Sequence, residues 1–192
     1  MVSPVPSNKY DDTTLGNINR LKDGCILLSH EDLMDPNFRL TVVLICIYNK
    51  DGAFGLVCNR PSHMPLSEVF NVDSALKTIR RSIYIGGPVQ QETLHIIQIT
   101  ATAAEHAYKV APNVYLGGEW ESLESILAED PQRTRLFLGY SGWSAGQLEA
   151  EIAEGAWEVY NVDLEKFLLQ WEEPLFRDVK KIRGYLKKLS IK

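Results

Sequence analysis

A short stretch in the C-terminal half has the residue types of a hydrolase nucleophile. Residues 142–146, Gly-Trp-Ser-Ala-Gly, fit the pattern Gly-x-Ser-x-Gly, in which a serine on a strand-to-helix turn attacks an acyl carbon. In the α/β-hydrolase order the histidine base follows the serine, whereas all four histidines here (positions 30, 63, 95 and 106) precede Ser144. The pattern therefore favours a serine that caps the following helix, with Gln147 as its capping-box partner, and predicts no catalytic residue.

The same glycine-rich corner, residues 139–147, offers a second kind of site. A helix N-terminus presents free N–H groups and a favourable dipole to an anion. Glu149 and Glu151 lie within two turns of that start and would oppose a strongly charged guest. We expect the corner either to wall a ligand site or to let a tryptophan close the core. The side chains placed to contact such a ligand are Tyr140, Ser141, Trp143, Ser144 and Gln147.

Two other short motifs carry candidate binding residues. Arg60, in Asn59-Arg60-Pro61, can contact a partner or can pair with a carboxylate and pin the preceding hairpin, which is the favoured interpretation. Gly86-Gly87-Pro88 is not typical of a phosphate loop, because proline removes a donor and a strand is expected to follow. Asn59, Arg60, Gly86 and Gly87 stay candidates for ligand or partner contact.

The charge of the chain is unevenly distributed. Residues 174–192 carry seven basic side chains and one acidic side chain, a net charge of +6. Because the whole chain has a net charge of −5, residues 1–173 have a net charge of −11. Apolar residues at helical spacing predict a basic helix that begins at Pro174. Its charges form either a solvated face or a docking surface for an acidic partner or nucleic acid. That surface consists of Lys180, Lys181, Arg183, Lys187 and Lys188.

The histidines and cysteines point to no metal or cofactor. No histidine pair has the spacing of metal ligands. Cys25, Cys46 and Cys58 form no Cys-x-x-Cys pair and lie among aliphatic residues, which predicts buried free thiols. With Asp51-Gly52 as a two-residue hairpin loop, Cys46 would face Val57, and a disulfide to Cys58 would need a register slip, which counts against it.

Length and composition are those of one globular domain. The 192 residues are 45% hydrophobic and 23% charged, enough to bury a full core without disulfides. No apolar run approaches the roughly 18 residues that span a bilayer, and the first ten residues contain no apolar signal core. We expect a cytoplasmic protein with no membrane contact, a flexible arm over residues 1–20 and a single domain over 21–192.

The elements that must position these motifs alternate irregularly along the chain. Strands come mostly in sequence-adjacent pairs with helices inserted between them, which favours an α+β fold over a regular βαβ repeat. Strands are expected at 25–28, 41–48, 53–58, 82–89, 93–100, 114–118, 134–140 and 157–160. Helices are expected at 65–70, 119–129, after Ser144 up to Gly155, after Asp163, and after Pro174.

Four pieces of the sequence together resemble the YqgE/AlgH family of bacterial proteins. They span roughly residues 24–160 in family order: Ser29 and Asp35-Pro-Asn-Phe38 followed by Val42-Val-Leu44; Gly52-Ala-Phe-Gly-Leu-Val57 with Asn59-Arg-Pro61; Gly86-Gly-Pro-Val89; and Leu138-Gly-Tyr-Ser-Gly-Trp143 with Gly146-Gln-Leu-Glu149 and Glu151-Ile152. The basic helix lies outside this pattern. The resemblance implies a barrel-like, bifurcated β-sheet surrounded by helices, and some members are described as transcriptional regulators. Glycine commonly stands at the position of Ser144 in the family, and no catalytic residues carry over.

Two functional hypotheses follow. The first is a non-enzymatic binding or regulatory protein, with an unknown protein or small-molecule partner, that contacts nucleic acid only through the basic helix. The second is a small-ligand-binding protein or hydrolase that uses the corner at residues 139–147. An enzyme should show a concave site with a base within reach of Ser144, whereas a binding protein should show an exposed patch or an unpaired strand edge.

Overall fold

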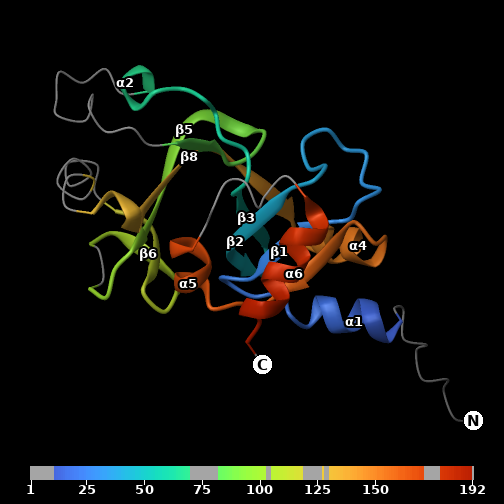
Figure 1. The fold of residues 1–192 in the computed structure, drawn as a ribbon. Helices are drawn as coiled ribbons and strands as arrows, with labels where there is room; N and C mark the ends of the chain where they lie inside the picture. The colour runs from blue at the N-terminus through green and yellow to red at the C-terminus, as the bar shows by residue number, and fades with distance from the viewer. Residues whose placement is uncertain are drawn as a thin grey trace, which may run out of the picture.

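The described part of the chain has an α+β fold in which one sheet is covered by helices on both faces (Figure 1). The computed structural model describes residues 11–69, 82–102, 105–118, 127, 130–170 and 178–191. The helices are α1 (Asp12–Ile18), α2 (Leu66–Val69), α4 (Gln147–Ala153), α5 (Leu164–Leu169) and α6 (Val179–Leu189), with a 3-10 turn η3 (Pro131–Arg133). The strands are β1 (Ile26–Ser29), β2 (Val42–Asn49), β3 (Gly52–Val57), β4 (Ile83–Ile85), β5 (Val89–Ile99), β6 (Ala107–Ala111), β7 (Val114–Gly117), β8 (Thr134–Ser144) and β9 (Trp157–Tyr160).

The described strands form one mixed, curled sheet that branches at β8. Its order is β6-β7-β5-β8-β3-β2-β1-β9, with β4 joined to β8 off this path. One edge of β8 pairs with β5, while its other edge pairs first with β4, in parallel, and then with β3. The branched sheet with its half-barrel curl confirms the predicted fold class.

Alternation along β2 separates two layers of the core, and a third cluster contains Ile83, Ile96 and Leu136. Val42 and Leu44 point into one layer, whereas Val43 and Ile45 point into the other, because successive strand residues face opposite sides. Apolar residues of α5 and α6 cover the first layer, and those of α1 and α4 cover the second. Both faces of the central strands are therefore buried, which explains why β2 reads as a continuous apolar run.

The β2–β3 hairpin is where it was predicted, but its register differs. Asn49 pairs with Gly52, so the loop is Lys50-Asp51, one residue earlier than expected. The Asn49 side chain accepts a 2.8 Å hydrogen bond from the Asp51 N–H and closes this turn. A bulge between Ile45 and Ile47 then changes the pairing, and the prediction that Cys46 faces Val57 is wrong.

Several predicted segments end differently from the expectation or fall outside the description. Residues 12–18, part of the predicted arm, form α1, whose Asn17 accepts a hydrogen bond from the Val159 N–H at 3.3 Å. The helix predicted at 119–129 lies outside the described residues except for Leu127, which is helical and fully buried. The last helix is capped by Asp178, and residues 174–177 of its predicted start are likewise outside the description.

Candidate functional site

The predicted corner is a continuation of β8 followed by a tight turn. The strand runs through to Ser144, and α4 begins at Gln147 with Gly146, at φ 77°, as its N-cap. Ser144 is therefore not the helix cap, so that part of the prediction is wrong, although Gln147 is its hydrogen-bond partner as expected. Glycine takes the cap position because the backbone there is left-handed.

Ser144 lies among groups that cannot activate it. Within the described part of the chain its hydroxyl has one hydrogen-bond partner, the Oε1 atom of Gln147 at 3.2 Å, and its N–H donates to the same oxygen at 3.0 Å. An amide oxygen is not a base at neutral pH, so this contact does not remove the hydroxyl proton. The geometry is that of a turn held by a side chain, and it supports no acyl transfer.

Trp143 closes the second core layer. Its ring is buried and tilted against Phe38 at 5.9 Å, with Trp157 edge-on at 6.1 Å. The indole N–H groups of Trp143 and Trp157 donate to the same carboxylate oxygen of Glu151, at 2.9 and 2.8 Å. Gln147 donates to the other oxygen at 3.1 Å. Of the two acidic residues expected to repel an anion, Glu151 thus binds both tryptophans to α4, and Glu149 accepts from the Tyr48 hydroxyl at 2.6 Å.

Gly86 and Gly87 lie in the fork where the sheet branches. The Gly86 N–H donates to the Leu138 carbonyl, and the Gly86 carbonyl accepts from the Val57 N–H, each at 2.8 Å. A Cβ on Gly86 would stand 2.4 Å from the carbonyl oxygen of Gly139, and one on Gly87 would stand 2.2 Å from the backbone of Tyr140. No side chain fits at either position, so these glycines permit close backbone approach.

Ser141 and Tyr140 complete the fork on opposite faces of β8. The fully buried Ser141 hydroxyl donates to the Gly86 carbonyl at 3.1 Å. Tyr140 stacks on Phe54 with ring centroids 4.7 Å apart, and His95 meets both rings edge-on. Burial lowers the pKa of His95 below its ordinary value, and its Nε2 atom is buried with no hydrogen-bond partner among the described residues.

Asn59 and Arg60 anchor the loop between β1 and β2. The Arg60 guanidinium donates to the carbonyl oxygens of residues 36, 37 and 39 at 3.0, 2.6 and 3.2 Å. Asn59 donates to the Leu40 carbonyl and accepts from the Val42 N–H. Arg60 was expected to pin the hairpin through a carboxylate, but it holds a different loop through backbone carbonyls.

The basic residues of α6 divide into two groups. Arg183 donates three hydrogen bonds of 2.7 to 3.1 Å to Glu158 and one of 3.1 Å to Glu31. It fastens α6 to β9, and its charge is neutralised within the molecule. The remaining cations are exposed and have no ion-pair partner among the described residues. This group, the lysine face, consists of Lys180, Lys181, Lys187 and Lys188.

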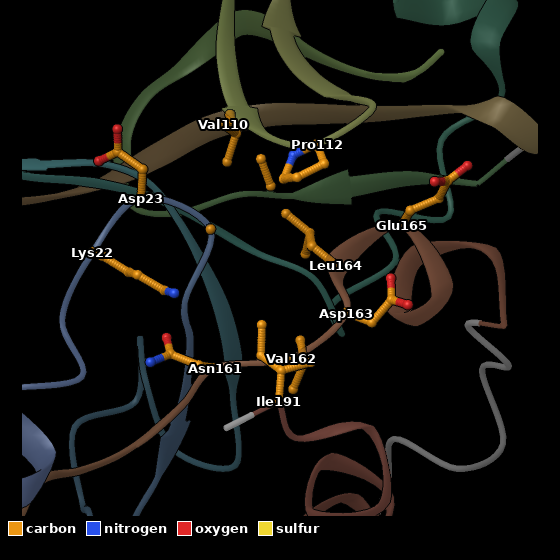
Figure 2. A pocket seen from close by; sticks show the side chains of 12 residues that line it. Lys22, Asp23, Val110, Pro112, Asn161, Val162, Asp163, Leu164, Glu165 and Ile191 are labelled. Atoms are coloured by element: carbon orange, nitrogen blue, oxygen red, sulfur yellow. The ribbon is translucent and has the colours of Figure 1, made fainter. Parts of the chain in front are cut away.

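The described hollows lie away from the predicted corner. One, of about 460 Å³, is bordered by residues 22–24, 110–112 and 161–165 together with Ile191 (Figure 2). A second, of about 660 Å³, includes Arg20, Glu158 and Lys187. Sequence reasoning missed both, because their walls come from loops and strand ends far apart in the chain, with no motif in common.

Cys25, Cys46 and Cys58 are free and buried, as predicted, and burial raises the pKa of Cys25 and Cys58 to about 12. Across residues 11–191, leaving aside the undescribed gaps, no three His, Cys, Asp or Glu side chains converge in a way that could hold a metal ion. No helix in the described ranges is long and apolar enough to cross a membrane.

The sequence and the fold of this chain are similar to those of known proteins. A family model described as AlgH-like matches residues 26–185. A UPF0301 protein of Chlorobaculum tepidum is 36% identical over 168 residues, covering 85% of this chain and 88% of its own. The solution structure of the AlgH protein of Pseudomonas aeruginosa has a TM-score of 0.70 at 27% identity, covering 100% of this chain and 94% of its own. The crystal structure of a Corynebacterium diphtheriae protein shares the fold, with a TM-score of 0.56 at 22% identity over 72% of this chain and 75% of its own.

Proposed function

This chain belongs to the AlgH-like family, and from that premise we propose that it is a non-enzymatic binding protein whose lysine face receives an acidic segment of a protein partner. The observation that carries the proposal is the contrast within α6. Arg183 is neutralised by Glu158 and Glu31, whereas four lysines on the same helix are exposed and have no ion-pair partner in the described part of the chain. A regulatory role, as the resemblance implies, would act through this contact.

The lysines gather on one side of α6. The buried residues Val179, Ile182, Leu186 and Leu189 fix the opposite side to the core. At 100° per residue, Lys180, Lys181, Lys187 and Lys188 fall within about 120° of arc, centred near Gly184. A compact stripe of charge is the surface that electrostatic complementarity recognises, and it also speeds association.

Gly184 at the centre of the stripe supports close docking. A Cβ there would meet nothing within 4 Å, so packing does not require glycine. Glycine in a helix interior costs about 1 kcal/mol relative to alanine. Its presence leaves the helix backbone open between the lysines, where a partner can approach closely.

The size of the stripe favours an acidic protein segment over nucleic acid. From Lys180 to Lys188 the helix rises about 12 Å, a length that a few acidic residues of a peptide can match. A DNA duplex would extend beyond the stripe over a body whose residues 1–173 carry a net charge of −11. Repulsion from that body opposes a long polyanion.

The test is the affinity of the full chain for a fluorescent glutamate-rich peptide and for a DNA duplex. The variant Lys180→Gln/Lys181→Gln/Lys188→Gln should weaken peptide binding at least about tenfold. The matched control, Lys50→Gln/Lys109→Gln/Lys166→Gln, removes the same charge from other exposed positions and should leave the affinity within about twofold.

A steric variant separates docking from long-range attraction. Gly184→Met keeps every lysine but fills the space between them, so it should also weaken the peptide complex while stabilising the helix. Equal losses in the test and control triple variants would contradict the proposal, as would tighter binding of the duplex than of the peptide.

A further inference from the structure

The hollow of about 460 Å³ lies where the two ends of the curled sheet approach each other, and it is a separate feature from the lysine face. Strand β6, at one end of the strand order, supplies Val110 and Ala111. Asn161 and Val162 directly follow β9, at the other end. Gly24 bridges them from the loop before β1, where a Cβ would stand 3.2 Å from the Val110 carbonyl oxygen. Figure 2 shows the side chains of these segments around the hollow.

The inner wall of this hollow is apolar and fixed. Val110, Val162 and Leu164 are each no more than 5% exposed and belong to the first core layer. Pro112 and Ile191 extend the apolar surface towards the rim, and the Ile191 side chain is exposed. A preformed apolar cavity of a few hundred Å³ with a few polar groups is the usual form of a small-molecule site.

The carboxylates at the rim already have partners. Asp23 accepts from the Tyr48 N–H at 2.7 Å and from the Tyr108 hydroxyl. Asp163 caps α5, and Glu165 accepts from the Asn113 amide at 2.8 Å. These groups shape the charge around the hollow, but most of their hydrogen-bonding capacity is used within the protein.

Two polar groups at the hollow have no such partner. The Oδ1 atom of Asn161 is buried without a hydrogen bond among the described residues. The Lys22 ammonium likewise has no ion-pair partner among the residues that the structure describes. Figure 2 shows its side chain extending towards the middle of the hollow. A buried acceptor left unsatisfied costs about 1–3 kcal/mol, and a bound donor recovers that loss once the Asn161 side chain turns its Oδ1 atom towards the hollow.

We propose that this hollow binds an uncharged amide with an apolar substituent. An amide carbonyl accepts from Lys22 while its N–H donates to Asn161 Oδ1, and the apolar substituent packs on Val110, Val162 and Leu164. A carboxylate ligand would face three rim carboxylates against one lysine. A protonated amine would be attracted by those carboxylates, but it would place its charge beside the Lys22 ammonium and could not accept the Lys22 hydrogen bond. The neutral amide satisfies both free groups without either repulsion.

The test uses three probes that share one apolar side chain and differ in charge. N-acetyl-leucinamide is neutral, N-acetyl-leucine is anionic and leucinamide is cationic. Each is titrated into the ¹⁵N-labelled full chain while amide chemical shifts are followed. The neutral probe should shift resonances of residues 22–24, 110–112 and 161–165 and bind at least about fivefold more tightly than either charged probe.

Two variants assign the contacts. Lys22→Met and Asn161→Leu should each weaken the neutral probe about fivefold or more, whereas the exposed Lys50→Met should not. Asn161→Leu should also keep or raise the melting temperature, because it removes a buried unsatisfied acceptor. A fall in stability with unchanged probe affinity would overturn the proposal and make Asn161 structural. So would absent shifts at the hollow or preference for a charged probe, and none of these outcomes bears on the lysine face.

Discussion

Ser144 shows how a residue pattern can match a reaction while its surroundings do not. Its hydroxyl contacts an amide oxygen of Gln147, and the half-buried His95 is engaged with Phe54 and Tyr140. The five-residue motif was visible in the sequence, but the partner of its serine was not, because hydrogen-bond partners depend on where the strand ends. β8 ends a few residues later than predicted, so Ser144 lies in the strand and Gly146 is the cap of α4.

His95 gives a pH-dependent prediction at the same scale. Burial lowers its folded-state pKa below the ordinary 6.5, so the unfolded chain binds the proton more tightly. Stability is then full above about pH 6.5 and is lost as the pH falls through the folded-state pKa. The melting temperature of the wild type should fall more between about pH 7 and about pH 5 than that of His95→Phe. The exposed His63→Asn serves as the control, and parallel profiles for wild type and His95→Phe would refute the assignment.

At the scale of elements, the glycine-rich motifs meet at the fork of the sheet. Gly139 bends β8 at φ 67°, and a Cβ there would stand 2.7 Å from the Gly87 carbonyl oxygen. Three of the four sequence pieces that resemble the family therefore converge on one junction between β3, β4 and β8. Their shared role is close backbone packing. This explains why the motifs suggest a binding corner in the sequence, whereas in the structure the backbone fills that corner.

Replacing Gly139 by alanine tests this account of the fork. The variant combines a left-handed backbone with a clash against backbone atoms, so it should cost about 3 kcal/mol or more in the free energy of unfolding. Gly155→Ala has a similar φ of 83° with open space around its Cβ, and should cost only about 1 kcal/mol. Chemical denaturation of both variants gives the comparison. Similar losses would mean that backbone conformation alone, and no steric fork, determines the glycine.

The sequence predicted the positions of strands and helices better than the turns and strand registers that connect them. A continuous apolar run located β2, the Asp51-Gly52 turn signal located its partner β3, and Asp163 marked the start of α5 correctly. The hairpin register was missed because Gly52 was assigned to the turn. In the structure it lies in the strand, where a Cβ would meet the Trp143 carbonyl at 2.0 Å. That constraint comes from a strand about ninety residues away, which local pattern reasoning does not contain.

For the whole molecule, an acidic body carries one exposed lysine stripe and, elsewhere, a lined hollow at the seam of its sheet. The sequence showed the stripe as a charge asymmetry but did not separate Arg183 from the lysines, since its neutralisation needs Glu158 and Glu31 beside it. Neither hollow was foreseen. The molecule therefore has two proposed binding surfaces, the lysine face and the hollow, while its most motif-rich segment packs the fork and the second core layer.

The salt dependence of peptide binding tests the central claim, docking of an acidic segment on the lysine face, most directly. The affinity of the wild type for the glutamate-rich peptide should fall roughly tenfold between about 0.05 M and about 0.3 M salt, because salt screens the attraction between exposed charges. The Lys180→Gln/Lys181→Gln/Lys188→Gln variant should bind weakly with little salt dependence, and Lys50→Gln/Lys109→Gln/Lys166→Gln should follow the wild type. A flat response in the wild type, or an unchanged slope in the α6 variant, would contradict the claim.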